Sequence, residues 1–344
     1  MKSLPLKNWG LFVGGLLILG LVGINGLAIM HGRAMTTLVS NGGDRTRPPE
    51  DLGILTKSKV LLTGVELPRP VPADPPASLL DLNLEPHRYP STSGHTLEAW
   101  YLPSPASPSA APISSPSYPT EHSSKPTAQN LFILFHPYGS SKISMVAIAQ
   151  ELHQMGHSVM LVDFYGSGGS SGTTTSIGYF EALDVVASVN YARKHWQPDT
   201  VQLYGASMGG AAVLRAVAVH GLEVEAIAIE SAFDSLLNTV RNRFVAMDLP
   251  STPLAELLAF WGGQQRGFNA FRHAPAEYAK QVSTPTLVLH GQGDRRVTQS
   301  QAEAIYHNLQ GWKYFSLYPG GGHGSSYQHN PSQWRNDLQR LQKN

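Results

Sequence analysis

Short apolar runs alternate with helical stretches over most of the chain beyond residue 130. Each run is continuously apolar rather than alternately apolar and polar, which is typical of strands buried on both faces of a parallel sheet. The runs are LFILF at 131–135, SVMLVDF at 158–164, TVQLYG at 200–205, EAIAIE at 225–230, PTLVLHG at 285–291 and KYFSLY at 313–318. Because the intervening helices supply the crossovers, the pattern predicts a doubly wound, mostly parallel α/β sheet.

Ahead of these runs, the stretch from Leu82 to Leu102 predicts a pair of strands. The segments HRYPST and HTLEAWYL flank the turn Ser93-Gly94, as in a hairpin. We expect this hairpin to open a folded domain over residues 81–344. Two insertions interrupt that domain, a Pro- and Ser-rich surface segment at 103–129 and a longer one at 235–284 that is expected to cap the strand ends.

The longest apolar stretch is Trp9 to Met30, with 22 residues and no formal charge. That length is sufficient for a helix that crosses a bilayer. A cleavable signal peptide is the main alternative, since Gly32-Arg33-Ala34 offers small residues for cleavage, and a buried core helix is the third. We predict an uncleaved membrane anchor at 1–31. A juxtamembrane linker follows at 32–80, with a weakly amphipathic piece near Leu52 to Val65.

Basic residues on both sides of this stretch affect the predicted orientation of the helix across the membrane. Lys2 and Lys7 precede it and favour a cytoplasmic amino terminus, with the folded domain on the extracytoplasmic side. Arg33, Arg45 and Arg47 follow it closely and act against that orientation. The sequence therefore predicts a single-pass membrane protein and favours an extracytoplasmic domain.

Composition and charge narrow the functional classes. The 344 residues carry 25 basic and 24 acidic side chains, a formal net charge of +1, and the basic residues form no run. No nucleic-acid partner is therefore expected. The lack of cysteine excludes disulfides, zinc–cysteine sites, iron–sulfur clusters and a cysteine nucleophile. The sequence requires no metal ion, and it leaves the oligomeric state open.

A serine nucleophile is predicted directly after the run at 200–205. Gly205-Ala206-Ser207-Met208-Gly209 fits the pattern G-x-S-x-G between a strand and the helical stretch AAVLRAVAVH. Small residues two positions either side of Ser207 allow a sharp turn that exposes its hydroxyl above the sheet. The alternative is a Gly-rich turn that serves close packing alone.

A serine hydroxyl needs a base, and the base needs an orienting carboxylate. Asp294 follows the run PTLVLHG and His323 follows KYFSLY. Both are therefore expected at the carboxyl ends of strands, where ligand sites of such folds lie. We predict His323 as the base, with His329 as the fallback. Asp294 is the predicted acid, and Asp234, after EAIAIESAF, is its competitor.

Two donors must also stabilise the oxyanion of the tetrahedral intermediate. The backbone N–H of Met208, directly after the nucleophile, is expected to be the first. The second is expected from the loop HPYG at 136–139, in which Pro137 has no N–H and Tyr138 is therefore the donor. An ordinary turn at the end of a strand is the alternative.

Together these residues resemble the α/β-hydrolase superfamily, in the branch that includes monoglyceride lipases and serine-aminopeptidase-like hydrolases. The resemblance covers about Leu84 to Leu341, and its motifs in chain order are LFHPYG, VDFYGSGGSSG, GASMGG, GQGDRRV and GGGHG. It implies a triad of Ser207, His323 and Asp294, with Tyr138 and Met208 as oxyanion donors, and it implies no cofactor. Pro137 departs from the glycine that many members have at this position.

The sequence thus predicts a membrane-anchored serine hydrolase that cleaves a small-molecule or lipid-like ester or thioester through an acyl-enzyme. A serine peptidase acting on short peptides is one alternative, with Glu256 or Glu277 holding the substrate amine. A non-catalytic membrane-anchored binding module is the other. The apolar residues of the 235–284 insertion are expected mostly to form a core of its own, and they are Phe244, Met247, Leu257, Leu258, Phe260, Trp261, Phe268 and Phe271.

Overall fold

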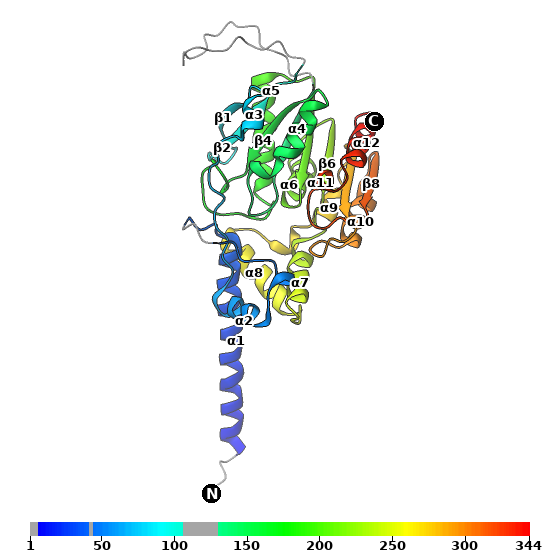
Figure 1. Ribbon diagram of the computed structural model, residues 1–344. Coiled ribbons are helices and arrows are strands. Elements are labelled where there is room, and N and C mark those ends of the chain that lie inside the picture. The colour runs from blue at the N-terminus through cyan, green and yellow to red at the C-terminus, as the bar shows by residue number, and fades with distance from the viewer. Residues whose placement is uncertain (1–5, 41–43, 106–129) are drawn as a thin grey trace.

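The computed structural model describes residues 6–40, 44–105 and 130–344 (Figure 1), so almost all of the predicted insertion at 103–129 lies outside the described residues. The strands are β1 (Glu85–Pro90), β2 (Thr96–Leu102), β3 (Asn130–Phe135), β4 (Ser158–Asp163), β5 (Thr200–Ala206), β6 (Ala226–Glu230), β7 (Thr286–Gly291) and β8 (Lys313–Tyr318). The longer helices are α1 (Leu6–Thr36), α2 (Ile54–Thr63), α4 (Val146–Gln154), α5 (Glu181–Trp196), α6 (Met208–His220), α7 (Leu236–Ala246), α8 (Leu254–Arg266), α10 (Gln299–Asn308) and α12 (Pro331–Leu341). Short helical turns are η1 (Pro49–Asp51), α3 (Ala77–Leu80), η2 (Lys142–Met145), η3 (Ala270–Arg272), α9 (Pro275–Ala279) and α11 (Ser326–His329).

All of these strands form one sheet in the order β1-β2-β4-β3-β5-β6-β7-β8. β1 and β2 form an antiparallel hairpin, β2 pairs antiparallel with β4, and the remaining pairs are parallel. The predicted doubly wound, mostly parallel α/β fold is therefore confirmed, and each of the six apolar runs contains a strand. The carboxyl ends of β5, β6, β7 and β8 meet at one edge, where such sheets build their ligand sites.

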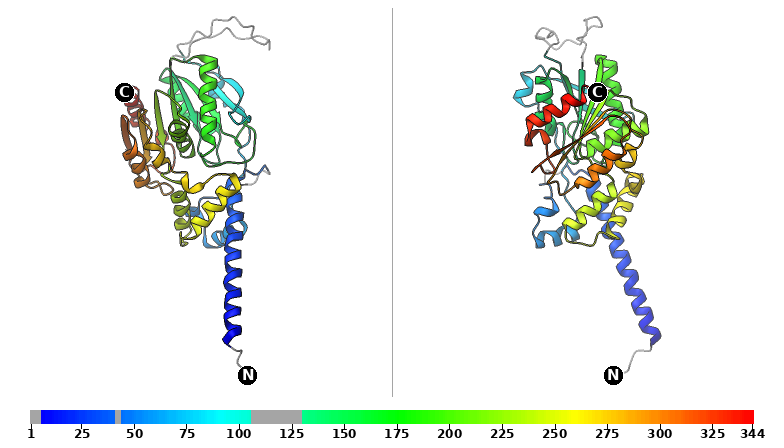
Figure 2. Two further views of the ribbon diagram at one scale, coloured as in Figure 1. Left: turned by 180° about the vertical axis from the view of Figure 1, so that it is seen from behind. Right: turned by 90° about the vertical axis from the view of Figure 1, so that its right-hand side faces the viewer.

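The apolar side chains of the sheet are divided between two buried layers. Along β3, Leu131, Ile133 and Phe135 pack with α5 and α6 on one face. Phe132 and Leu134 pack with α4 and α12 on the other face. Burial of both faces explains why the runs carry no alternating polar positions. Figure 2 shows the helices on either side of the sheet.

Helix α1 extends from the body at the end where α2, α7 and α8 lie (Figures 1 and 2). Within the described part of the chain, its segment Gly14–Thr36 is the one helix long and apolar enough to span a membrane, by length and composition. A signal sequence near the amino terminus has the same properties. The structure thus contains a candidate membrane span in α1.

The last turns of α1 cross α8 at close range. A Cβ added to Gly32 would lie 2.9 Å from the backbone N of Gly262, so the two backbones touch where neither residue has a side chain. Trp261 Nε1 donates a hydrogen bond to Asn25 Oδ1 at 2.8 Å. The helix is therefore joined to the body by specific packing over its last third.

The segment that follows α1, predicted as a linker, lies against the body. The backbone N–H of Val39 donates to Leu67 O at 2.9 Å, and Val39 forms an isolated bridge with Pro68. The side chains of Leu38 and Leu67 are buried. This segment is therefore in a position to contribute to a site on the sheet domain.

Candidate active site

The turn after β5 holds Ser207 in a strained backbone conformation. Ser207 has φ 51° and ψ −109°, and α6 begins at the next residue. A Cβ on Gly205 would lie 2.5 Å from the carbonyl carbon of Gly209, so the turn can close only with glycine there. The Ser207 N–H donates to Glu230 O of β6 at 2.7 Å. Such a strand-to-helix turn presents a serine hydroxyl above the edge of the sheet.

The loop after β3 packs directly on this turn. A Cβ on Gly209 would come within 2.3 Å of Phe135 O, so the glycine allows the two backbones to touch. Ser207, Met208 and Tyr138 line the same cavity. The structure therefore brings together the predicted nucleophile and the two residues predicted to donate to the oxyanion.

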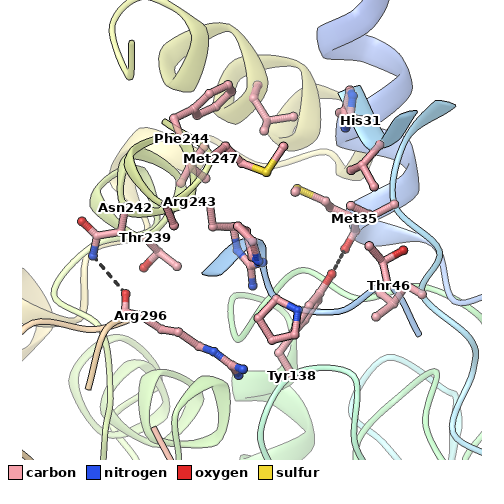
Figure 3. Close-up of a pocket in the computed structure, with 18 of the residues that line it drawn as sticks. His31, Met35, Thr46, Tyr138, Thr239, Asn242, Arg243, Phe244, Met247 and Arg296 are labelled. Carbon is pink, nitrogen blue, oxygen red and sulfur yellow. Dashed lines mark hydrogen bonds between the residues drawn. The ribbon is translucent and has the colours of Figure 1, made fainter. Parts of the chain in front are cut away.

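Tyr138 is held from two sides by the amino-terminal segment. Its hydroxyl donates to Met35 O of α1 at 2.5 Å, as Figure 3 shows. The Arg45 guanidinium donates to Tyr138 O at 3.3 Å and to Gly139 O at 3.1 Å. The end of α1 and the segment behind it thus fix the loop that carries the predicted second oxyanion donor.

His323 and Asp294 form a close pair beside this turn. His323 Nδ1 lies 2.7 Å from Asp294 Oδ2, and the Asp294 side chain is fully buried. The other carboxylate oxygen accepts from the N–H of Arg296 at 2.8 Å and of Val297 at 3.0 Å. Burial alone would raise the pKa of Asp294, but the hydrogen bonds and positive charge of His323, with these N–H groups, lower it below its usual value. Asp294 is therefore held as an anion that can orient the imidazole.

Asp234 and His329, the alternatives for the acid and the base, form hydrogen bonds with other groups. Asp234 accepts from Asn238 Nδ2 at 2.6 Å and from Gln301 Nε2 at 2.7 Å, in a cluster at the start of α7. His329 is exposed, and its Nε2 lies 2.7 Å from Pro319 O. His323 lines the cavity with Ser207. The geometry therefore favours Asp294 and His323 over Asp234 and His329.

A buried carboxyl group that the sequence did not single out lies at the end of β6. Glu230 accepts a hydrogen bond from the Tyr204 hydroxyl at 2.6 Å and another from the Ser326 N–H. Burial raises the pKa of Glu230. Because its backbone carbonyl also holds the Ser207 N–H, Glu230 joins the Ser207 turn to the loop that follows His323. The run EAIAIE gave no sign of this role, since a strand-end Glu is usually solvated.

Ser207 and His323 open onto a cavity of about 810 Å³, which is within the range of small-molecule sites. Most of its wall comes from α1, residues 45–67, the loop after β3 and the α7–α8 segment, and the loops after the strands add the rest, including residues 295–297. Within the described residues, no group of three or more His, Asp or Glu side chains is arranged to hold a metal ion. The cavity is thus suited to an organic substrate with a large apolar part.

The apolar residues of the 235–284 insertion are divided between core and cavity. Phe268 and Leu258 belong to the buried cluster between α7, α8 and the sheet, whereas Phe260 and Phe271 are exposed. Those that line the cavity are Phe244, Met247, Leu257 and Leu258. The expectation that most of these residues form a core was therefore wrong, because α1 and residues 45–67 supply the opposite wall and leave a gap between.

One face of α1 forms part of the cavity wall, which the sequence did not predict. The residues on this face are Ile24, Leu27, Ala28, His31 and Met35. Their spacing of three and four places them on one side of a helix. A uniformly apolar stretch of this length is typical of a helix surrounded by lipid, so only the polar interruption at His31 distinguished this face.

The sequence is similar to one family profile and to proteins of two bacteria. The sequence profile of the family described as serine aminopeptidase, S33, matches residues 126–249. Uncharacterized protein YqkD of Bacillus subtilis (strain 168) is 25% identical over 220 residues, which is 62% of this chain and 72% of YqkD. Uncharacterized protein YfhR of Escherichia coli (strain K12) is 23% identical over 235 residues, 67% of this chain and 70% of YfhR.

Solved structures share the fold at low sequence identity. The Pyrococcus furiosus esterase Pf2001 superposes with a TM-score of 0.60 at 18% identity, covering 80% of this chain and 97% of the esterase. The α/β hydrolase GrgF from Penicillium sp. sh18 gives 0.57 at 16% identity, covering 76% and 98%. These likenesses establish the fold.

Proposed function

We propose that this chain, a member of the α/β-hydrolase superfamily in its lipase- and aminopeptidase-like branch, is a membrane-anchored serine hydrolase. It cleaves a carboxylic ester or thioester through an acyl-enzyme intermediate. The observation that carries the proposal is the 2.7 Å contact between His323 and Asp294 at the cavity that also contains the strained Ser207.

The proposed mechanism assigns each group one task. His323 Nδ1 is engaged by Asp294, so Nε2 is the ring nitrogen that accepts the Ser207 proton as Oγ attacks the acyl carbonyl. The N–H groups of Met208 and Tyr138 stabilise the developing oxyanion. His323 then passes the proton to the leaving alkoxide or thiolate, and water cleaves the acyl-enzyme by the same steps in reverse order.

The packing of α1 supports an uncleaved anchor over a signal peptide. α1 continues through Gly32-Arg33-Ala34 to Thr36 without a break. Cleavage there would remove Ile24, Leu27, Ala28 and His31, which line the cavity. With Lys2 and Lys7 ahead of the apolar stretch Trp9–Met30, we place the folded domain on the extracytoplasmic side.

The contacts of the acidic residues in the cap favour esters over peptides. Glu256 forms an ion pair with Arg241 at 2.6 Å, and Glu277 forms one with Lys280 at 2.9 Å. Neither glutamate lines the cavity. The residues considered for holding a substrate amine therefore lie away from Ser207, and a peptidase would need a different amine-binding group.

The test is fluorophosphonate labelling of the purified full-length protein, followed by hydrolysis of p-nitrophenyl butyrate. Ser207→Ala is expected to abolish both signals. Ser140→Ala is the matched control, because Ser140 lines the same cavity outside the strained turn, and it is expected to keep both. Equal labelling of intact protein and Ser207→Ala would refute the assignment of the nucleophile, and a folded intact protein that takes no label would favour the binding-module alternative.

A further inference from the structure

The charged residues of the cavity are nearly all positive. Among the described residues that line it, Glu66 is the acidic side chain, and the basic ones are Arg45, Arg47, Arg243, Arg295 and Arg296. The whole chain carries a net charge of only +1, so a general excess of basic residues does not explain the positive charge of the cavity. The positive charge is therefore a local property of the cavity.

Arg45 and Arg243 lie close to Tyr138, and Arg296 lies close to Arg45. The Arg45 guanidinium lies 5.6 Å from the centre of the Tyr138 ring and donates to the Tyr138 carbonyl. Figure 3 shows Arg243 beside Tyr138, with the Arg296 side chain extending toward them from the other side of the cavity. Burial lowers the pKa of Arg45, and the nearby charges of Arg243 and Arg296 lower it further. These guanidinium groups repel one another across the cavity, and an anion between them would relieve that repulsion.

Two of these three arginines form no ion pair with an Asp or Glu within the part of the chain that the structure describes. Arg45 and Arg243 form no ion pair there. Arg241, two residues before Arg243 on α7, is paired with Glu256 and does not line the cavity. Arg243 is half-buried and Arg45 is exposed. Guanidinium groups that face a cavity and have no ion-pair partner are suited to bind an anionic ligand group through charge-assisted hydrogen bonds.

Two of the cavity arginines adjoin the His323–Asp294 pair along the chain. Arg295 and Arg296 directly follow Asp294, and the Arg296 N–H binds the Asp294 carboxylate. Because His323 gives its proton to the leaving group, that group must lie beside the His323–Asp294 pair. The anion that fits the arginines therefore belongs to the alcohol or thiol part of the substrate.

The other end of the cavity is apolar and lies beside the candidate membrane span. The α1 face with Ile24, Leu27 and Ala28 lies there, opposite the apolar side chains of α7 and α8. On the outer side of α2, Ile54 and Leu55 are 83% and 87% exposed. Apolar side chains so exposed, beside a candidate membrane span, are suited to contact with lipid. An acyl chain can therefore lie against α1 at the membrane end of the cavity.

We propose that the substrate is an amphiphilic acyl ester or thioester whose leaving group carries a phosphate. The acyl chain lies between α1 and the cap, and the phosphate lies among Arg45, Arg243 and Arg296. This inference rests on the proposed function. In the reaction, the Ser207 Oγ–acyl bond forms as the acyl–oxygen or acyl–sulfur bond breaks, and the Ser207 proton leaves with the phosphorylated alcohol or thiol. Two sources share this chemistry, a lysophospholipid of the membrane and a soluble phosphorylated acyl thioester.

The test compares substrates that share one oleoyl chain. The full-length protein in neutral detergent micelles is given 1-oleoyl-lysophosphatidylglycerol, neutral 1-monooleoylglycerol and oleoyl-coenzyme A, with p-nitrophenyl butyrate as the reference. At least one phosphorylated substrate is expected to exceed the neutral one in kcat/KM by about tenfold or more. Activity on the lysolipid identifies a membrane source, and activity on the thioester identifies a soluble one.

Matched variants locate each end of the cavity. Arg243→Gln is expected to remove most of the preference for phosphorylated substrate, whereas Arg241→Gln on the same helix keeps it. Ala28→Phe is expected to shift the preferred acyl chain to shorter lengths, whereas Val22→Phe, at a position 65% exposed on α1, leaves it unchanged. The two control variants, Arg241→Gln and Val22→Phe, are expected to keep butyrate hydrolysis, and the preferences of Arg243→Gln and Ala28→Phe are read as ratios of kcat/KM between substrates within each variant.

The outcomes separate this inference from the proposed function. Hydrolysis of p-nitrophenyl butyrate that depends on Ser207, with no preference for phosphorylated substrates, would overturn the inference and leave the hydrolase standing. The same holds if Arg243→Gln and Arg241→Gln reduce the preference equally. Loss of both butyrate hydrolysis and fluorophosphonate labelling in the folded intact protein would instead contradict the hydrolase itself.

Discussion

Substituting Gly32 by Leu tests whether α1 forms a working wall of the cavity. A Cβ at this position would lie 2.9 Å from Gly262 N, 3.0 Å from Gly262 Cα and 3.1 Å from Gln265 Nε2. The first two are backbone atoms of α8, which cannot rotate away. Leu at position 32 must therefore push α1 and α8 apart.

The size of the effect follows from these distances. Non-bonded carbon atoms settle at about 3.5–4.0 Å, so the helices must separate by about 0.5–1 Å at the crossing. Overpacking of this kind costs about 1–3 kcal/mol, which changes the ratio of docked to undocked α1 by about 5- to 150-fold. The hydrogen bond from Trp261 to Asn25, another 1 kcal/mol or so, is weakened as well. The sheet core lies elsewhere, so the unfolding transition of the body is expected to stay unchanged.

The assay compares p-nitrophenyl dodecanoate with p-nitrophenyl butyrate on the full-length protein in one detergent. Gly32→Leu is expected to lower kcat/KM for the dodecanoate about fivefold or more, because the long chain loses its wall, and to change butyrate hydrolysis much less. Gly23→Leu is the matched control, since nothing lies within 4 Å of a Cβ at Gly23. Equal kcat/KM of the two variants on the dodecanoate would refute the assignment of α1 to the acyl site.

Three further substitutions test the catalytic pair and the body that supports it. Asp294→Asn, which loses the charge that orients His323, is expected to lower kcat for p-nitrophenyl butyrate by about 10³–10⁴-fold with unchanged circular dichroism; a loss under tenfold would count against this acid. Lys142→Met is expected to reduce the free energy of unfolding in urea by about 3–5 kcal/mol. The reason is that the fully buried Asp163 carboxylate loses its ion pair with the Lys142 ammonium group, which is itself buried. Burial raises the pKa of Asp184 to about 8, so the native state binds that proton more tightly than the unfolded chain, and wild-type stability falls as pH rises from about 4 to about 8. Asp184→Asn removes this dependence, so its stability relative to wild type should grow across that window in urea titrations, and a constant difference would contradict the assignment.

The parallel sheet could be predicted because its strands are buried on both faces. Each run is apolar throughout, and the residues that follow β5, β7 and β8 include the three residues of the proposed triad. Ser207, Asp294 and His323 could be named for the same reason, since each follows a strand and the carboxyl ends of parallel strands share one edge. The choice of Asp294 over Asp234 needed the structure, because Asp234 also follows a strand that ends at this edge.

The walls of the cavity could not be predicted in the same way. They depend on how α1 and residues 45–67 pack across the cap, which is a contact between segments some 200 residues apart, as between Asn25 and Trp261. In the sequence, Arg45 appears only as a charge behind an apolar stretch, and Arg243 as one of several polar residues on a helix. Their convergence on Tyr138 is visible only once the chain is folded.

The most direct measurement of the central claim is the mass of the acyl-enzyme. The full-length protein is mixed with p-nitrophenyl butyrate, quenched in acid within the first turnover and digested for peptide mass spectrometry. The account predicts a butyryl group on the peptide that contains Ser207, present in the intact protein and missing from Ser207→Ala. Turnover with the butyryl group on another residue, or with the adduct retained in Ser207→Ala, would contradict it.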